Sequence, residues 1–221
     1  MFADRLAEVE NRIALACQSS GRKRSDILLL PVTKVFPVSA ILEAHAHGLR
    51  DFGENYVQEF EGKAPELTHI HDSRFHLIGH LQSNKARRAA ELFQVIQTVD
   101  SVKLARRIAE YSDTPKQVMI EVKLSHEDAK HGAMPEELGD LIDGIRALPK
   151  LELTGLMTMP PWDEDAEKAR PYFIELRKLA EKHHLPQLSM GMSNDLEVAI
   201  AEGSTIVRVG TALFGKRIKP Q

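Results

Sequence analysis

The chain has 221 residues, and its 29 lysine and arginine residues against 32 aspartate and glutamate residues give a formal charge of −3. With 43% hydrophobic and 28% charged residues, the composition is that of an ordinary globular protein and excludes a disordered, collagen-like or low-complexity chain. The slight acidic excess argues against binding to nucleic acid through bulk charge, so we expect no nucleic-acid partner. Cys17 is the only cysteine, which excludes an internal disulfide and a zinc site with several cysteine ligands.

The sequence also bears on the location of the protein. No apolar run approaches the roughly 20 residues that a membrane span needs. The amino-terminal segment is charged from its fourth residue and lacks the apolar stretch of a signal peptide. We therefore expect a cytoplasmic protein that does not bind membranes.

The chain opens with an amphipathic helix and then repeats a unit of apolar strand, turn and charged helix. Apolar residues from Phe2 to Ile13 recur at helical spacing, and Gly21 ends this helix. Seven of the eight predicted strands are followed by a predicted helix. The strands are expected at 27–34, 51–55, 75–80, 95–100, 118–123, 153–159, 187–193 and 205–210. The helices after them are expected to begin near Val38, Tyr56, Asn84, Ser101, Pro135, Asp165 and Asp195. Ser101 and Asp195 are suited to be N-caps.

Alternating strands and helices indicate parallel strand pairing with right-handed crossovers. Eight such units predict an α/β fold, a single (β/α)₈ TIM barrel with an extra N-terminal helix, although such barrels typically have about 250 residues. The open doubly wound sheet is the alternative. Glycine and proline are scattered singly and mark no linker, so residues 1–221 are expected to form one domain.

Function in a barrel lies at the carboxyl ends of the strands, and Lys34 ends the first predicted strand there. Burial at such a position lowers the pKa of an amine and activates it for Schiff-base formation. The other interpretation is a lysine that simply leaves the barrel for solvent.

The last two predicted strands end in turns of small polar residues. Barrels often bind phosphate after strands seven and eight, at the start of a short extra helix. Gly210 permits close backbone approach, Thr211 offers a hydroxyl and an amide, and Ser193 offers a second hydroxyl. The alternative is two ordinary strand-to-helix turns.

Arg208 lies inside the last predicted strand and, by the period of two, faces the same way as Gly210. Its side chain therefore points either into the barrel mouth or towards the helices. A buried arginine needs an acceptor, so a structural ion pair is the simpler interpretation.

Three other polar clusters give little indication of a functional site. His45 and His47 do not share a helix face, and His69 and His71 lack a third ligand, so we expect no metal site. The basic segment 85–88 is interpreted as a solvated helix face.

Six segments in order along the chain resemble the pyridoxal phosphate homeostasis proteins, also called the proline synthase co-transcribed group. They are Val32-Thr33-Lys34, Phe52-Gly53-Glu54-Asn55-Tyr56-Val57-Gln58-Glu59, Ile78-Gly79-His80-Leu81-Gln82-Ser83-Asn84-Lys85, Gly155-Leu156-Met157-Thr158-Met159, Ser189-Met190-Gly191-Met192-Ser193-Asn194-Asp195 and Val207-Arg208-Val209-Gly210-Thr211-Ala212-Leu213-Phe214-Gly215.

The resemblance implies a barrel like the amino-terminal domain of alanine racemase, with pyridoxal 5′-phosphate (PLP) at its mouth. It implies that Lys34 holds the cofactor as an internal aldimine and that Arg208 faces the pyridine nitrogen, with Asn55 beside the ring. Ser193, Gly210 and Thr211 would bind the phosphate. Lys130 matches a segment thought to offer a secondary lysine for cofactor transfer. Val35-Phe36-Pro37 departs from the small or basic residues expected after the lysine.

Three functions remain open: a PLP carrier or reservoir, a PLP enzyme such as a racemase, and a cofactor-free Schiff-base aldolase. The carrier is favoured because racemisation needs an acid–base group on each face of the cofactor, and the chain ends six residues after Gly215. We therefore expect the second racemase domain to be absent. An arginine at the pyridine nitrogen also weakens the electron sink that carbanion chemistry uses. The expected protein is a non-catalytic, monomeric PLP carrier in vitamin B6 homeostasis whose partners are PLP and PLP-accepting apoenzymes.

Overall fold

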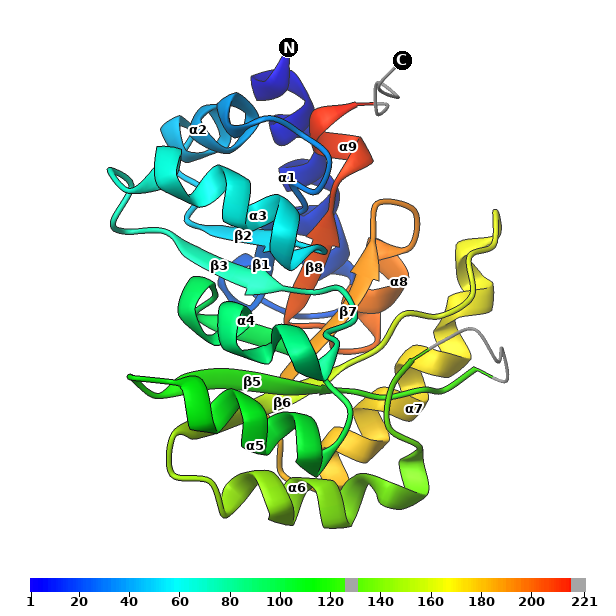
Figure 1. The fold of residues 1–221 in the computed structure, drawn as a ribbon. Helices are drawn as coiled ribbons and strands as arrows, with labels where there is room; N and C mark the ends of the chain where they lie inside the picture. Colours follow the sequence, from blue (N-terminus) through cyan, green and yellow to red (C-terminus); the bar gives the residue numbers. More distant parts are fainter. Residues whose placement is uncertain (126–130, 216–221) are drawn as a thin grey trace.

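Eight parallel strands form the centre of the protein, and the computed structural model describes residues 1–125 and 131–215 of it (Figure 1). The strands pair in the order β1-β8-β7-β6-β5-β4-β3-β2. A bridge between Val32 and Gly53 joins β1 to β2 and completes the ring. The fold is therefore the predicted (β/α)₈ barrel, and the open doubly wound alternative is wrong. The strands are β1 (Leu28–Pro31), β2 (Asp51–Glu54), β3 (Arg74–Leu77), β4 (Val95–Val99), β5 (Lys116–Glu121), β6 (Leu151–Met157), β7 (Gln187–Met192) and β8 (Ile206–Val209).

All eight predicted strands are present, each with at least one boundary shifted by one to three residues, and two of these shifts have a clear local reason. β5 begins two residues early because the Lys116 side chain is buried and its Nζ donates to the Phe93 carbonyl at 2.9 Å. β1 ends at Pro31, three residues before Lys34, because the chain turns at Thr33 to Phe36, where the Phe36 N–H donates to the Thr33 carbonyl at 3.1 Å.

Helices cover the outside of the ring, and each predicted helix is present (Figure 1). They are α1 (Phe2–Ser19), α2 (Val38–Ala46), α3 (Val57–Lys63), α4 (Ala86–Leu92), α5 (Val102–Tyr111), α6 (Leu138–Arg146), α7 (Arg170–Lys182), α8 (Leu196–Ala201) and α9 (Thr211–Phe214). Single 3₁₀ turns lie at Arg24–Asp26, Ala64–Leu67, Ser83–Lys85, Pro135–Glu137 and Ala166–Ala169. Three of these turns stand where α4, α6 and α7 were predicted to begin. None of the helices in the described part of the chain combines the length and hydropathy that crossing a bilayer requires.

The two predicted N-caps differ. The Ser101 Oγ accepts the Leu104 N–H at 3.3 Å and so caps α5 as expected. Asp195 precedes α8, but its Oδ1 accepts the Met192 N–H at 2.6 Å and makes no cap hydrogen bond. Its carboxylate therefore holds the turn before the helix rather than the helix end.

α1 packs against α8 and α9 and covers the side of the barrel where β8 is followed by a single helical turn. Phe2 and Ile13 are buried in this contact, and Gly21 ends the helix with φ at +68°. The Arg5 Nε donates to the Leu213 carbonyl at 2.6 Å, and the Arg12 Nε donates to Glu197 at 2.6 Å. The extra helix thus holds the two elements that follow the last strands.

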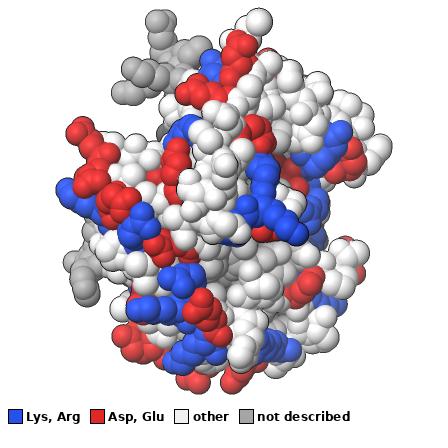
Figure 2. All heavy atoms as spheres, turned by 180° about the vertical axis from the view of Figure 1, so that it is seen from behind, with Lys and Arg blue, Asp and Glu red and all other residues white. Residues whose placement is uncertain are grey.

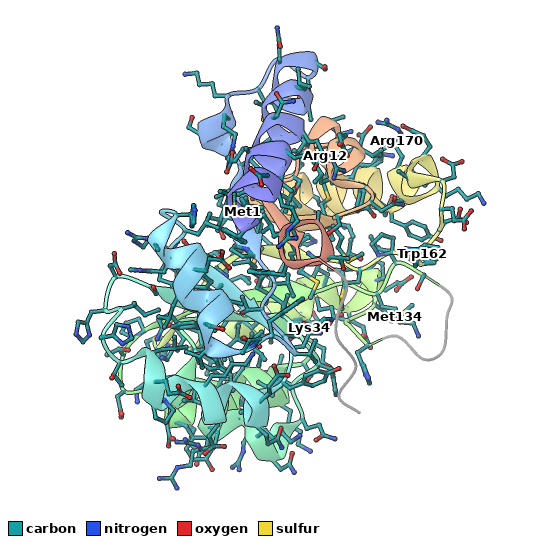
Figure 3. All side chains as sticks on the ribbon, turned by 90° about the horizontal axis from the view of Figure 1, so that it is seen from above. Met1, Arg12, Lys34, Met134, Trp162 and Arg170 are labelled. Atoms are coloured by element: carbon teal, nitrogen blue, oxygen red, sulfur yellow. The ribbon has the colours of Figure 1, made fainter. Side chains whose placement is uncertain are left out.

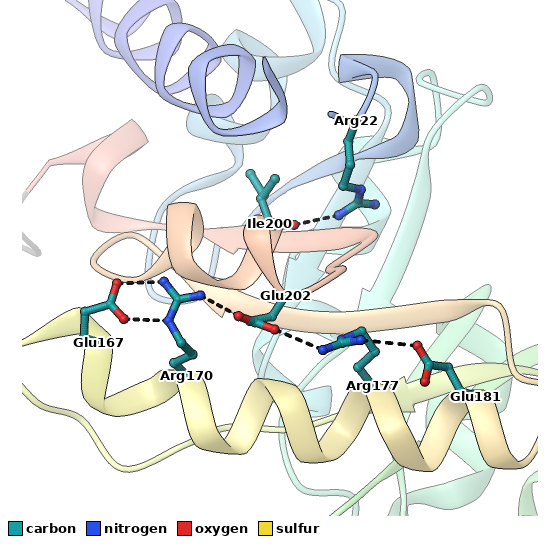
Figure 4. Close-up of polar contacts among 7 residues, drawn as sticks. All are labelled: Arg22, Glu167, Arg170, Arg177, Glu181, Ile200 and Glu202. Carbon is teal, nitrogen blue, oxygen red and sulfur yellow. Dashed lines mark hydrogen bonds and ion pairs between the residues drawn. The ribbon is translucent and has the colours of Figure 1, made fainter. Parts of the chain in front are cut away.

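An ion-pair network fixes α7 against the end of α8 (Figure 4). Arg170 pairs with Glu167 at 2.6 Å and with Glu202 at 2.5 Å, and Arg177 pairs with the other oxygen of Glu202 at 3.3 Å. Arg22 donates to the Ile200 carbonyl at 3.0 Å from the other side. The position of α8, and hence of the turn before it, is therefore set by both neighbours.

The two faces of the strands carry separate cores. Most buried apolar residues lie between the strands and the helices. A small cluster of Leu30, Val32, Ile78, Met119 and Ile206 forms a second core, in which Leu30 and Val32 are two residues apart, the period of inward-facing barrel residues. The barrel interior is therefore filled rather than hollow.

Acidic and basic side chains are intermixed on the face turned away in Figure 1 (Figure 2). The basic segment at 85–88 follows this pattern on the surface, where Arg87 pairs with Glu91 at 3.1 Å and Arg88 with Glu61 at 2.7 Å. These contacts agree with the interpretation of that segment as a solvated helix face.

Candidate functional site

A pocket of about 290 Å³ lies at the carboxyl ends of the strands. It is lined by all of the site residues named from the sequence, which come from the ends of β1, β2, β7 and β8. They are Lys34, Asn55, Ser193, Arg208, Gly210 and Thr211. The structure therefore brings together residues that are distant in the sequence, at the end of the barrel where such folds carry function.

Lys34 reaches this pocket from the turn after β1. Figure 3 shows it near the middle of the molecule, with Trp162 out at the edge. The half-buried side chain lines the pocket, so it lies at the barrel mouth rather than out in solvent.

Asn55 follows β2 directly, and Gly79 after β3 is what allows it to sit there. A Cβ built on Gly79 would lie 2.2 Å from the Asn55 carbonyl oxygen, so no larger residue fits. The Asn55 Oδ1 is buried and has no hydrogen-bond partner. Buried polar atoms are normally paired, so this oxygen marks a place where a bound group would supply the missing donor.

Arg208 points into the barrel, which settles the two directions that the sequence left open. Its side chain is buried, with Nη1 donating to Ser189 Oγ at 2.9 Å and Nη2 to the Thr158 carbonyl at 2.9 Å. Both acceptors are uncharged, so the predicted simpler role as a structural ion pair is wrong.

A chain of buried hydrogen bonds in the barrel interior orients Arg208. Ser189 Oγ donates to Gln97 Oε1 at 2.6 Å, and Gln97 Nε2 contacts His76 Nδ1 at 3.0 Å. His76 Nε2 contacts Asp51 Oδ1 at 2.8 Å. With His76 carrying its proton on Nε2, every contact pairs one donor with one acceptor. The guanidinium is therefore held by a continuous polar path through the barrel interior.

Burial lowers the pKa of this arginine but leaves it charged at neutral pH. Desolvation lowers the pKa of Arg208 to about 10, and the negative charges of Asp195 and Glu121 oppose that shift. The guanidinium remains positive at neutral pH, so the pocket holds a fixed cation beside Lys34.

The two small polar turns lie next to each other. The Ala212 N–H donates to Ser193 Oγ at 3.4 Å, which connects the turn after β7 to the start of α9. A Cβ on Gly210 would make only ordinary contacts, with Val32 at 3.5 Å, and its φ of −111° suits any residue. Packing within the protein does not require glycine here, whereas close approach of a bound group would.

The loop after β6 is the part of the site that the sequence did not indicate. Trp162, Asp163 and Asp165 line the pocket, and Trp162 is 73% exposed. The Asn194 Nδ2 donates to the Asp163 carbonyl at 3.1 Å and so ties this loop to the turn after β7. The only tryptophan of the chain, beside two prolines at a strand end, was the available signal.

A second pocket of about 200 Å³ adjoins the first, and Met159 lines both. The rings of His80 and His131 stack there with centroids 3.6 Å apart. Glu121 is buried beside them, and desolvation raises its pKa to about 7, against the attraction of Arg208.

Lys130 lies outside the described residues. Among the described residues, no cluster of three or more histidine, cysteine, aspartate or glutamate side chains is arranged to hold a metal ion.

Comparison with known proteins identifies the same barrel fold. The family model for the alanine racemase N-terminal domain matches residues 6–218. Alanine racemase of Clostridium difficile has the same fold, with a TM-score of 0.75 at 15% identity over 96% of this chain and 57% of the racemase. At that identity the likeness concerns the fold alone.

Two relatives are much more similar. The pyridoxal phosphate homeostasis protein of Pseudomonas aeruginosa is 46% identical over 223 residues, which cover 98% of this chain and 96% of that protein. PipY of Synechococcus elongatus, whose solved structure has PLP bound, is 38% identical with a TM-score of 0.83 and covers 97% of this chain and 100% of its own. Because these matches extend over nearly the whole length of both proteins, the chain belongs to the family of pyridoxal phosphate homeostasis proteins.

Proposed function

We propose that this protein binds pyridoxal 5′-phosphate in the pocket lined by Lys34 and acts as a non-catalytic carrier or reservoir in PLP homeostasis. The observation that carries the proposal is the convergence of one lysine, one fixed arginine and two small polar turns in a single pocket. The names of the full-length relatives support it, as does the PLP bound in PipY.

The roles of the residues follow from their chemistry. Lys34 would hold the cofactor through its Nζ, and Ser193, Gly210 and Thr211 would hold the phosphate. Arg208 would act at the pyridine nitrogen, and Asn55 would act beside the ring. The unpaired Asn55 Oδ1 and the open space at Gly210 fit a bound group of this kind. PLP supplies a reactive aldehyde, which the pocket keeps from other amines.

Adduct mapping tests this proposal. The purified protein with PLP should show a visible absorption band, and borohydride reduction followed by peptide mapping should place the cofactor on Lys34. A colourless protein, or a reduced adduct on another lysine, would contradict the proposal.

The phosphate contacts give a second expectation. Hydrogen bonds to a charged group contribute about 1.5–3 kcal/mol each, so Ser193→Ala or Thr211→Val should weaken PLP binding about tenfold or more. Titration with PLP measures this, and Thr68→Val, at an exposed site away from the pocket, should leave the affinity unchanged. Pyridoxal, which has no phosphate, should bind equally to all variants, and equal losses for both ligands would place the phosphate elsewhere.

The acid–base groups of the pocket support a carrier rather than an enzyme. Among its described lining residues, the acids are Asp163, Asp165 and Asp195, and no histidine, tyrosine or cysteine is present. Asp195 already accepts the Met192 N–H, and Asp163 and Asp165 belong to the loop after β6. A fixed positive charge at the pyridine nitrogen disfavours protonation of the ring, and protonation is what strengthens the electron sink.

We therefore expect no catalysis on common amino acids. General acid–base help typically supplies about 10²–10⁴-fold, and the described residues that line the pocket include no histidine, tyrosine or cysteine to supply it. Incubation with L- and D-amino acids in heavy water, with Lys34→Ala as control, should give no lysine-dependent deuterium exchange at the α-carbon. Rapid exchange into any of them would favour a PLP enzyme instead.

Transfer to PLP-accepting apoenzymes, a monomeric state, a cytoplasmic location and a single domain over 1–221 stay predictions.

A further inference from the structure

The turn that carries Lys34 contains a residue in an unfavourable conformation. Lys34 and Val35 are the central residues of the turn closed by the Phe36 N–H and the Thr33 carbonyl. Val35 has φ at +61°. Turns with a positive φ at the second central position normally place glycine or asparagine there, and a β-branched residue is strained. Val35 is also 53% exposed, so packing of its side chain does not impose the conformation.

Two side chains of α3 hold the peptide groups on both sides of Lys34. The Lys63 Nζ donates to the Thr33 carbonyl at 3.0 Å, which belongs to the peptide bond entering Lys34. The Glu59 Oε1 accepts the Val35 N–H at 2.6 Å, which belongs to the peptide bond leaving it. Lys63 and Glu59 are four residues apart on the helix and pair with each other at 2.7 Å.

A third residue anchors this ion pair in the protein interior. The Glu54 Oε1 accepts from the Lys63 Nζ at 2.9 Å and from the Thr33 Oγ1 at 2.7 Å. Glu54, Thr33 and Lys63 are all buried. A buried ammonium with three oxygen acceptors has little freedom to move, so the turn is attached to a rigid point on α3.

We propose that Glu59 and Lys63 are positioning residues that hold Val35 at positive φ and thereby aim Lys34 into the pocket. The inference rests on the proposed role of Lys34 and adds how the chain keeps that lysine in place. Without the two contacts, Val35 would relax to negative φ. The peptide bonds on both sides of Lys34 would then rotate, and the amine would leave its place in the pocket.

The first arm of the test needs no cofactor. Glu59→Ala should raise the exchange rate of the Val35 amide, followed by NMR, about tenfold or more, because the acceptor of that N–H is lost. Glu59→Gln keeps an acceptor oxygen and should restore most of the protection. Glu61→Ala is the matched control, since Glu61 lies on the same helix but pairs with Arg88. It should leave the Val35 amide unchanged.

The second arm measures the rate at which the visible band forms when PLP is added. Glu59→Ala should slow it about tenfold, and Glu59→Gln less. Glycine adopts a positive φ without strain, so in a Val35→Gly background the same Glu59→Ala change should cost less than about threefold. A merely structural role for Glu59 would give equal losses in both backgrounds.

The outcomes separate the two proposals. A wild-type protein that forms no adduct on Lys34 would overturn the proposed function, whatever the amide exchange shows. A normal wild-type adduct with an unchanged rate in Glu59→Ala, or with equal losses in the valine and glycine backgrounds, would overturn the positioning role alone. Should Glu59→Ala fail to fold, Glu59→Ser, whose side chain is too short to keep the contact with the Val35 N–H, is compared in the two backgrounds with the same outcomes.

Discussion

Replacing Lys34 with alanine should abolish the visible absorption of the protein mixed with PLP and leave its fold intact. Lys34 is the only lysine among the described residues that line the main pocket, so no other amine of the described lining can take its place there. Its side chain is half-buried and is not part of either hydrophobic core, so little stability is lost with it. Absorption spectra before and after dialysis measure the effect, with far-ultraviolet circular dichroism to monitor the fold.

Lys123 provides the matched control. It also follows the end of a strand, but it lines the second pocket rather than the first. Lys123→Ala should keep the full visible band. Retention of the band in Lys34→Ala, or its loss in Lys123→Ala, would show that the wrong strand end has been assigned.

Replacing Glu121 with glutamine should remove a pH dependence of stability worth about 3 kcal/mol. Burial raises the pKa of this carboxyl from 4.5 to about 7, and each pKa unit corresponds to about 1.4 kcal/mol. Between these two values the folded protein retains a proton that the unfolded chain has lost. The free energy of unfolding therefore falls as pH rises from about 4.5 to 7 and loses no more above 7.

Urea unfolding at pH 5, 6, 7 and 8 without added cofactor measures this effect as a difference between variant and wild type. Glu121→Gln should gain stability relative to wild type across the first three values and keep a constant advantage from pH 7 to 8. Glu152→Gln, at an exposed position on β6, should track the wild type throughout. A constant difference for Glu121→Gln from pH 5 to 8 would mean that the carboxyl titrates normally.

The fold could be predicted from the sequence because its signals are local. Each strand is a short apolar run and each following helix has an apolar face, so the alternation alone led to eight parallel units. Local patterns do not show whether the sheet closes into a barrel. The bridge between Val32 and Gly53 depends on the curvature of the whole sheet, and for that reason the open sheet remained an alternative. The helix starts at α4, α6 and α7 were also placed early, because 3₁₀ turns carry the same capping residues as helices.

The candidate site was predictable where a side chain ends a strand and faces inward. Arg208 within β8 is of this kind, and Lys34 follows in the turn after β1, although only the structure shows that Arg208 binds uncharged acceptors. Glu54 also ends a strand, but it faces outward to Lys63 on α3. The spacing of Glu59 and Lys63 indicates that these two side chains pair on one helix face. No local pattern in the sequence shows that they also bind the backbone on both sides of Lys34. Trp162 joins the pocket through a loop whose course depends on its contact with the β7 turn.

The pairing of the first strand with the last has a consequence for the newly made chain. Lys34 leaves the ribosome early and Thr211 late, and at 5–20 residues per second the interval between them is roughly 10–35 s. During that time Lys34 exists without Arg208, Gly210 and Thr211, so the pocket proposed to bind PLP is incomplete. The pocket is complete only when β8 pairs with β1. A ligand that binds only the closed ring stabilises that ring by mass action, so a cofactor bound in this pocket would stabilise the pairing of the first strand with the last.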